Sequence, residues 1–210
     1  MTDLVDGLAL AELVIEKVRQ EPTRSMFDYF TLPWVDGEPS PMGADELAEV
    51  RFPSGRPLSP SLRAWLAFDT SLFDRFGWFD ENGDLAPRTL AELVADEYGE
   101  PWTEVYAPVA GGFPECFLLP GGSDSRRVLT VGEPDATGEY PVLALDIDDM
   151  PFVGLMYPGF DVYLAETAGL LKLEFESYTS LAEDPRYLRR MHQHGKNYFG
   201  GDVCYEYPFD

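Results

Sequence analysis

Three aspartates stand directly after the most apolar run of the chain. Residues 141–147 are Pro, Val, Leu, Ala and Ile apart from Asp146, and Asp148 and Asp149 follow. An aspartate at the end of a buried strand, with a second one two residues later, could serve as the nucleophile of a metal-assisted phosphatase. The lysine and the acidic motif that such enzymes carry downstream cannot be placed in the remaining 210 − 149 = 61 residues. We therefore favour an acidic β-turn, because aspartate readily bonds to the backbone of turns.

A second acidic cluster, Asp80, Glu81 and Asp84, surrounds an Asn-Gly pair. A calcium loop of the EF-hand type needs glycine at its sixth position and glutamate at its twelfth. Those positions hold Leu85 and Ala91, so the pattern fails and a plain turn is favoured.

The two histidines, His192 and His194, are the remaining candidate metal ligands, together with Asp202 and Cys204. Residues two apart point to different faces of a helix. A basic helix C-terminus is the favoured interpretation of this stretch. No Gly-x-Ser-x-Gly motif and no phosphate loop with lysine is present in the sequence. The sequence thus predicts no catalytic residue, no metal and no cofactor.

Net charge is the strongest global property of the chain. Lys and Arg total 15 and Asp and Glu total 38, so the net charge is 15 − 38 = −23. Such a field repels nucleic acid and anionic membranes and attracts basic partners. Simple solubility, or an organism whose proteins are generally acidic, is the alternative explanation.

Several expectations about the cellular setting follow from composition. No apolar run approaches the roughly 20 residues that cross a membrane. Acidic residues stand near Met1, where a signal peptide carries Lys or Arg. We expect a cytoplasmic protein, a monomer or weak homodimer, with Cys116 and Cys204 as free thiols.

Apolar periodicity and turn signals predict a single α+β domain over residues 1–210. The predicted sheet is largely antiparallel or mixed, has about five to six strands and is flanked by helices, because tight turns join the strands. A partly extended segment is expected over 26–41, and the alternation in 172–178 would supply the sixth strand. The predicted helices cover 3–20, 44–50, 60–70, 88–98, 161–171 and 184–195, and the predicted strands cover 105–106, 116–119, 127–131, 141–147 and 152–157.

Two stretches together resemble the SUKH (SMI1/KNR4-like) superfamily. The first is Pro57-Leu-Ser-Pro-Ser-Leu-Arg-Ala-Trp-Leu, followed after a gap by Gly77-Trp78. The second is Tyr140-Pro-Val-Leu-Ala-Leu-Asp-Ile-Asp-Asp, followed by Tyr157-Pro-Gly-Phe-Asp-Val-Tyr-Leu. The resemblance covers roughly residues 56–170. It leaves a helical N-terminal extension (1–50) and a C-terminal extension (171–210) outside.

The resemblance implies a sheet flanked by helices and a binding function. Many bacterial members are immunity proteins that bind and block a toxin, often a nuclease, whereas fungal members are regulatory or scaffold proteins. A strongly acidic protein suits a nuclease, because enzymes that grip phosphates tend to be basic. We expect a non-enzymatic immunity protein that neutralises a basic cognate toxin. The alternatives are a regulatory or scaffold protein and a metal-dependent phosphatase using Asp146 and Asp148.

The expected partner-binding surface combines acidic turns with aromatic anchors. Interfaces concentrate binding energy in a few such anchors. For each aromatic residue, ordinary core packing is the alternative. The expected binding residues are Asp146, Asp148, Asp149, Asp80, Glu81, Asp84, Trp78 and Tyr157.

Overall fold

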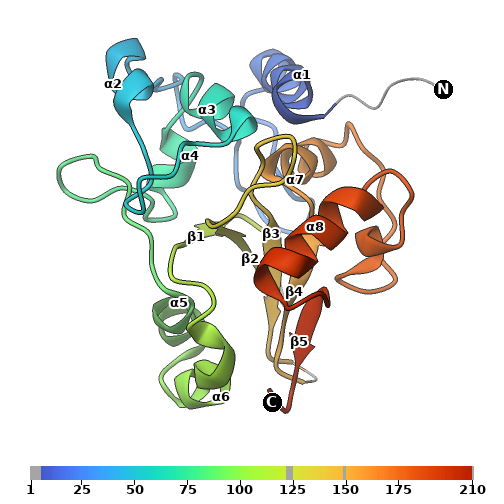
Figure 1. Cartoon of the computed structure of the whole chain (residues 1–210). Coiled ribbons are helices and arrows are strands. Elements are labelled where there is room, and N and C mark those ends of the chain that lie inside the picture. The colour runs from blue at the N-terminus through green and yellow to red at the C-terminus, as the bar shows by residue number, and fades with distance from the viewer. Residues whose placement is uncertain (1–5, 122–124, 149, 210) are drawn as a thin grey trace.

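A twisted antiparallel sheet runs through the middle of the molecule and separates two groups of helices (Figure 1). The structure is a computed structural model and describes residues 6–121, 125–148 and 150–209. Within these residues five strands follow one another in the order β1-β2-β3-β4-β5, so the sheet is a simple meander. The α+β class with a five-stranded antiparallel sheet is therefore confirmed. The strands are β1 (Cys116–Leu119), β2 (Ser125–Thr130), β3 (Val142–Asp146), β4 (Phe152–Tyr157) and β5 (Cys204–Glu206).

Most helices precede the sheet in sequence, and two follow β4. Four of the first six lie before Asp80, and the other two lie between Asp80 and β1. A short 3₁₀ helix (Ser180–Ala182) separates the last two. The helices are α1 (Gly7–Gln20), α2 (Ala44–Glu49), α3 (Pro60–Leu66), α4 (Ser71–Asp74), α5 (Leu90–Tyr98), α6 (Pro101–Ala110), α7 (Phe160–Thr167) and α8 (Leu188–Tyr198).

Each face of the sheet has its own helical cover. Neighbouring residues of a strand point to opposite faces. Arg126 of β2 forms a salt bridge with Glu97 of α5 at 2.7 Å, so α5 lies on the face opposite to Arg127. On the face of Arg127, Tyr163 of α7 packs edge-on against Tyr157 with a ring separation of 5.7 Å.

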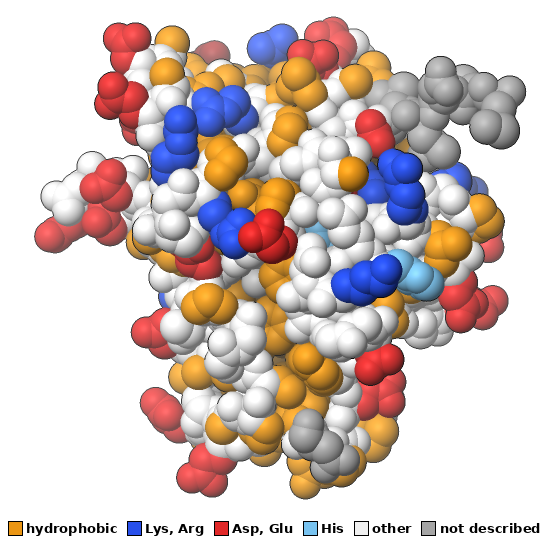
Figure 2. Space-filling model, viewed as in Figure 1, with side chains coloured by type: hydrophobic (Ala, Val, Ile, Leu, Met, Phe, Trp, Pro, Cys, Tyr) orange, Lys and Arg blue, Asp and Glu red, His pale blue; other side chains and the backbone are white. Residues whose placement is uncertain are grey.

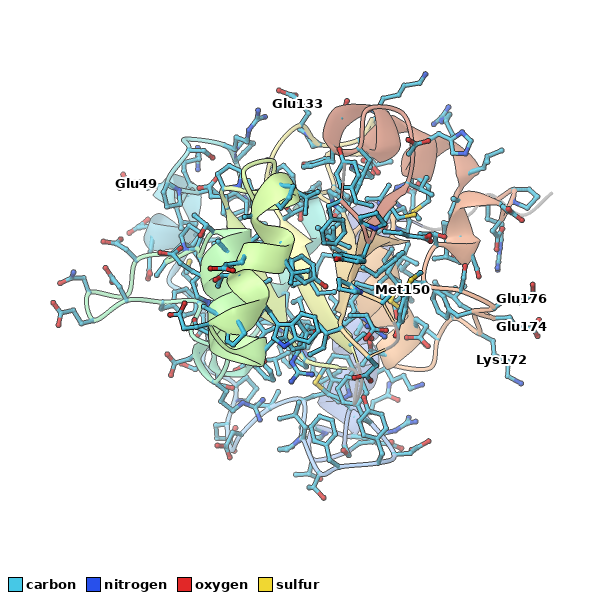
Figure 3. The ribbon with its side chains drawn as sticks, turned by 90° about the horizontal axis from the view of Figure 1, so that it is seen from below. Glu49, Glu133, Met150, Lys172, Glu174 and Glu176 are labelled. Atoms are coloured by element: carbon cyan, nitrogen blue, oxygen red, sulfur yellow. The ribbon has the colours of Figure 1, made fainter. Side chains whose placement is uncertain are left out.

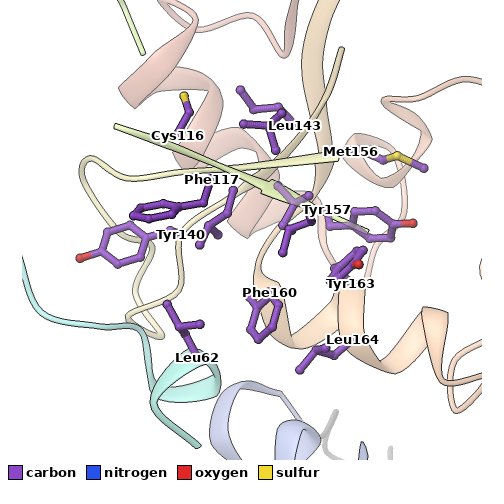
Figure 4. Packing of buried hydrophobic residues seen from close by; sticks show 14 of the residues in the cluster. Leu62, Cys116, Phe117, Tyr140, Leu143, Met156, Tyr157, Phe160, Tyr163 and Leu164 are labelled. Atoms are coloured by element: carbon purple, nitrogen blue, oxygen red, sulfur yellow. The ribbon is translucent and has the colours of Figure 1, made fainter. Parts of the chain in front are cut away.

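The main core lies between the sheet and the α1, α3 and α7 helices. Figure 4 shows Leu62 of α3 and Phe160 of α7 on the side of the sheet that carries Phe117 and Tyr157. One apolar cluster extends from Leu10 to Phe199, so segments outside residues 56–170 contribute to the same core.

Local sequence signals explain several element boundaries. Ser59 accepts a hydrogen bond from Leu62 N and Pro60 takes the first position of α3, as the Ser-Pro pair predicts. Thr89 and Glu92 form a reciprocal capping box at the start of α5. The hairpin predicted over residues 141–157 is confirmed as β3 and β4.

Two predicted strands are wrong. Residues 105–106 belong to α6, which Pro101 begins and in which Tyr106 and Val109 are buried one turn apart. Residues 172–178 form no strand, although Leu173 and Phe175 still pack against the core. In both cases the apolar side chains pack against other parts of the chain, without the hydrogen bonds to a neighbouring strand that the short apolar pattern predicted.

Two further details differ from the sequence prediction. The helix predicted over 60–70 ends at Leu66, and the separate short helix α4 begins at Ser71, just after the buried Asp69, which accepts hydrogen bonds from Leu72 N and Ser40 N. Strand β5 was not predicted, since three residues carry too little pattern. Residues 3–5 of the first predicted helix, 3–20, lie outside the described residues.

A buried arginine ties distant parts of the chain together. Arg190 of α8 donates to Asp135, which precedes β3, at 2.5 Å. It also makes a two-pronged contact with Asp161 of α7, at 2.9 Å for each bond. Asp161 additionally accepts from Gly7 N at the start of α1, at 2.7 Å. The three charged side chains are shielded from solvent, so each depends on the others for compensation.

A third carboxyl group, that of Glu139, lies beside this cluster. It accepts from Ser61 N at 2.9 Å and bonds the Ser61 hydroxyl at 2.5 Å. Burial, with the neighbouring charge of Asp161, raises the pKa of Glu139 to about 8. Burial works against ionisation of Asp135 too, but His194 and Arg190 outweigh it and hold the pKa of that carboxyl below its usual range.

We predict that Arg190→Met destabilises the protein by about 3–5 kcal/mol, because it leaves two buried carboxylates uncompensated. Urea denaturation followed by circular dichroism measures the change. The matched control is Arg186→Met, which removes a partly exposed pair with Asp184 and should cost about 1 kcal/mol or less. Equal stability of the two variants would contradict the prediction.

We predict that stability falls as the pH rises from about 5 to 8. A glutamate titrates near ~4.3 in an unfolded chain. Between that pH and about pH 8, Glu139 is protonated in the folded state but ionised in the unfolded state. The free energy of unfolding therefore falls by at most about 1.4 kcal/mol for each unit by which the pH rises. The stabilising contribution of Asp135 is lost only under more acidic conditions, because its pKa is lowered.

Thermal melts at pH 5 and pH 8 test this dependence. Glu139→Gln removes the titrating group and should reduce the difference between the two melting temperatures. Glu174→Gln, at an exposed position, is the control and should leave the difference unchanged. An unaltered pH dependence in Glu139→Gln would count against the assignment.

Candidate functional site

A cavity with a volume of about 810 Å³ lies on the Arg127 face of the sheet. Strand residues that point to one face of the sheet form the floor of the cavity. Ser125 and Arg127 share this face because they are two residues apart in β2, and the register places Phe152 of β4 level with Ser125 across the sheet. Helix α7 closes one end. Two irregular segments, around Phe27 and around Tyr178, form the remaining walls together with Pro120, Gly121 and Glu206 of β5.

A cation lies at the floor of this cavity. Arg127 donates to Ser125 Oγ at 2.5 Å, and its guanidinium lies 5.7 Å from the centre of the Tyr178 ring. Among the described residues, none of the salt bridges includes Arg127. The cavity therefore contains hydrogen-bond donors available to an acidic group.

A carboxyl group stands on the α7 side of the same cavity. Glu166 accepts from the Tyr157 hydroxyl at 3.2 Å. Burial raises the pKa of Glu166, while the Tyr157 hydrogen bond and the charge of Arg127 act in the opposite direction. The aromatic walls include Tyr157 edge-on to Phe175, at 5.6 Å between ring centres.

A second candidate surface lies at the open end of the β3–β4 hairpin. Met150 is 55% exposed and Tyr207 is 51% exposed, and Tyr207 N donates to Pro151 O at 3.0 Å. The exposed carboxylates of Asp148 and Glu206 flank these two side chains in sequence. We call Asp148, Met150, Glu206 and Tyr207 the hairpin-end patch. Exposed large apolar side chains with a charged rim are typical of protein-binding surfaces.

The structure places the predicted residues of the acidic turn near both surfaces. Asp146 accepts from Tyr178, which lines the cavity, at 2.7 Å, and also from Asp148 N at 3.0 Å. Asp148 is exposed in the hairpin-end patch. Asp149 lies outside the described residues. Tyr157 is nearly buried, but it lines the cavity.

The second predicted acidic cluster lies elsewhere. Asp80, Glu81 and Asp84 are exposed on a loop that projects from the side of the molecule, whereas the hairpin ends at the bottom near the C-terminus (Figure 1). The view from below agrees, with Met150 near the centre and the loop at the far left (Figure 3). Asp80 accepts from Asn82 N and Asp84 N, which accounts for the loop as a turn.

The predicted anchor Trp78 requires correction. Its side chain is 0% exposed and stacks on Phe73 with ring centres 4.1 Å apart. Its indole nitrogen donates to Leu118 O at 2.6 Å. Trp78 is therefore a core residue that a partner cannot reach in this conformation, as the core-packing alternative anticipated.

The sequence reasoning missed Arg127, Glu166, Met150 and Tyr207. A signal existed for Arg127, because an arginine inside an otherwise apolar strand needs a polar environment on one face. Glu166 appeared only as one of many carboxylates. Met150 and Tyr207 carried no signal, since their proximity depends on strand β5.

The surface charge is largely uncompensated. Arg56, Arg88 and Arg126 each pair with a carboxylate of this chain, as do Arg24, Arg186 and Arg190. In the view of Figure 2, basic side chains gather over α8 and the upper middle, and acidic ones occupy much of the outline. Since internal pairs already engage many cations, the net charge of −23 is carried by exposed carboxylates.

The residues considered for zinc do not converge. His192 is exposed, whereas His194 is buried with Nε2 3.0 Å from Pro158 O. Within the described ranges, no group of three or more His, Cys, Asp and Glu residues is arranged to hold a metal ion. The described helices also include none that is both long and apolar enough to span a membrane.

Comparison with protein-family models and with curated proteins gives no match. Among solved structures the chain is similar to the crystal structure of an uncharacterized protein from Salmonella enterica subsp. enterica serovar typhimurium str. 14028s. The two share 17% sequence identity with a TM-score of 0.52, over 93% of this chain and 94% of the other. At this identity the likeness concerns the fold alone. It covers nearly the whole of both chains and thus includes the terminal segments.

We predict that Trp78→Ala lowers the free energy of unfolding by about 3–5 kcal/mol, because it empties a buried aromatic site. Tyr29→Ala, at a side chain 57% exposed, is the control and should change stability by about 1 kcal/mol or less. Guanidinium denaturation measures both. A stable Trp78→Ala variant would restore Trp78 as a candidate for partner binding.

Proposed function

We propose that this chain is a non-enzymatic acidic binding protein of the immunity type, which binds and neutralises a basic toxin. The observation that carries the proposal is the uncompensated negative charge, −23 in 210 residues, on a protein in which salt bridges within the described residues engage six of the twelve arginines. The resemblance of residues 56–170 to the SUKH superfamily supplies the biological setting. A nuclease-type toxin suits the charge, because its phosphate-binding cleft would be positive.

The hairpin-end patch is the proposed centre of the interface. Met150 and Tyr207 provide exposed apolar anchors, and Asp148 and Glu206 provide charges that would pair with a basic partner. Apolar anchors supply most of the affinity, while rim charges set orientation and the rate of encounter. The Asp80 loop lies on another side of the molecule and contributes only to long-range attraction.

The first experiment captures the partner and tests neutralisation. The tagged protein is purified from its native cells grown in contact with kin, and the bound proteins are identified by mass spectrometry. We expect one stoichiometric basic protein that is toxic when expressed alone and harmless when co-expressed with this chain. Several host proteins without toxicity would instead favour a regulatory or scaffold role and overturn the proposal.

We predict that Met150→Ala/Tyr207→Ala and Asp148→Lys/Glu206→Lys each weaken binding of that protein at least about tenfold, which is about 1.4 kcal/mol. Isothermal titration calorimetry measures the affinity. The charge-reversal effect should shrink at high salt, because exposed charges are screened. Glu81→Lys/Asp84→Lys is the matched control, with the same change in net charge, and should alter affinity less than about threefold. Equal losses in both charge reversals would move the interface away from the hairpin-end patch.

A further inference from the structure

The cavity on the Arg127 face is a built site that the proposed toxin binding does not use. Its volume of about 810 Å³ lies within the range of small-molecule sites. Aromatic side chains form a large part of its lining, and polar side chains, which include one arginine and three glutamates, form another. The aromatic residues are Phe27, Tyr29, Phe152, Tyr157, Tyr163, Phe175 and Tyr178.

The shape of the floor depends on a glycine. A Cβ at Gly154 would come within 2.5 Å of Cζ of Phe152 and 2.6 Å of Cβ of Cys204. The absence of a side chain there lets the Phe152 ring lie flat along the strand, where it also packs 5.4 Å from the Tyr178 ring. The floor and one wall are thereby fixed in place.

Arg127 and three carboxylates, those of Glu166, Glu176 and Glu206, line the cavity, and Arg127 does not pair directly with Glu166. Arg127 and Glu166 both line it, yet no nitrogen of Arg127 lies within 4.0 Å of a Glu166 oxygen, since the pair is not among the salt bridges of the described residues. The charge of Arg127 nevertheless influences the pKa of Glu166, so the two groups face the same space. One side of the cavity thus suits a carboxylate and the other suits an ammonium group.

A neutral ligand with both charges fits this arrangement better than a singly charged one. An anionic molecule would approach against the net charge of −23. A cationic side chain would meet Arg127 at the floor, and the Tyr178 ring that could attract it already faces that guanidinium. A zwitterion avoids both penalties.

We propose that this cavity binds a small amino-acid-type zwitterion with an aromatic side chain. Arg127 binds its carboxylate, Glu166 binds its ammonium group, and the aromatic walls enclose its ring. Glu206 belongs both to the lining of the cavity and to the hairpin-end patch, whereas Arg127 and Glu166 belong only to the cavity, so variants of these two residues test this proposal without altering the patch.

Isothermal titration calorimetry with three related probes tests the assignment. The probes are L-phenylalanine, N-acetyl-L-phenylalanine, which lacks the ammonium group, and L-phenylalaninamide, which lacks the carboxylate. We expect L-phenylalanine to bind the full chain with a dissociation constant below about 1 mM. Each blocked derivative should bind at least about tenfold more weakly, because one partly buried charge of the cavity loses its partner.

Variants assign each charge to its partner. Arg127→Met should weaken the binding of L-phenylalanine at least about tenfold, yet leave the weak binding of L-phenylalaninamide unchanged, because that probe lacks the carboxylate. Glu166→Gln should likewise weaken the binding of L-phenylalanine at least about tenfold, yet leave the weak binding of N-acetyl-L-phenylalanine unchanged. Arg126→Met, on the opposite face of β2, and Glu174→Gln, which does not line the cavity, are the controls and should bind like the unchanged protein. Thermal melts confirm that every variant is folded.

Three results would overturn the proposal. The first is no binding of any probe up to about 10 mM. The second is binding of L-phenylalaninamide at least as tight as that of L-phenylalanine, which would make the cavity a site for a basic side chain. The third is unchanged binding of L-phenylalanine in folded Arg127→Met.

Discussion

The pairing of Arg190 with Asp135 and Asp161 is the interaction on which the arrangement of helices around the sheet depends. It joins α8 to the turn before β3 and to α7, and Asp161 continues the connection to Gly7 at the start of α1. Charges buried so completely are stable only as a set, because removing any member leaves the others without compensation. Apolar packing alone would tolerate several arrangements of these helices, whereas the directional bonds of a guanidinium specify one.

The sequence predicted the elements whose signals are local. The Ser59-Pro60 helix start and the hairpin over residues 141–157 depend on neighbours in the chain, and both were found. The misassigned segments, 105–106 and 172–178, are short apolar patterns that suit a strand, a helix or an irregular cover equally well. Only the packing of distant residues decides among these, and no short stretch of sequence contains that information.

The candidate surfaces were harder to predict for the same reason. Asp146 and Tyr157 were predicted as partner-binding residues; the structure places Tyr157 in the lining of the cavity and Asp146 in contact with Tyr178, and the cavity is assembled from six separate parts of the chain. Trp78 illustrates the opposite case, because an aromatic residue that follows a turn has the same local sequence whether it enters the core or faces a partner. Net charge, which needs no coordinates, remains the property that most directly links this sequence to a kind of partner.

Strand β5 has a consequence for the behaviour of the chain in concentrated solution. It pairs with β4 through Phe152, Val153 and Gly154, and so occupies hydrogen-bonding groups that would otherwise form the border of the sheet. An unpaired border of this kind can recruit the same strand from another molecule and begin aggregation. The three residues of β5 thus cover the edge of the most apolar hairpin of the chain. A protein that lost them would be prone to self-association although its core was intact.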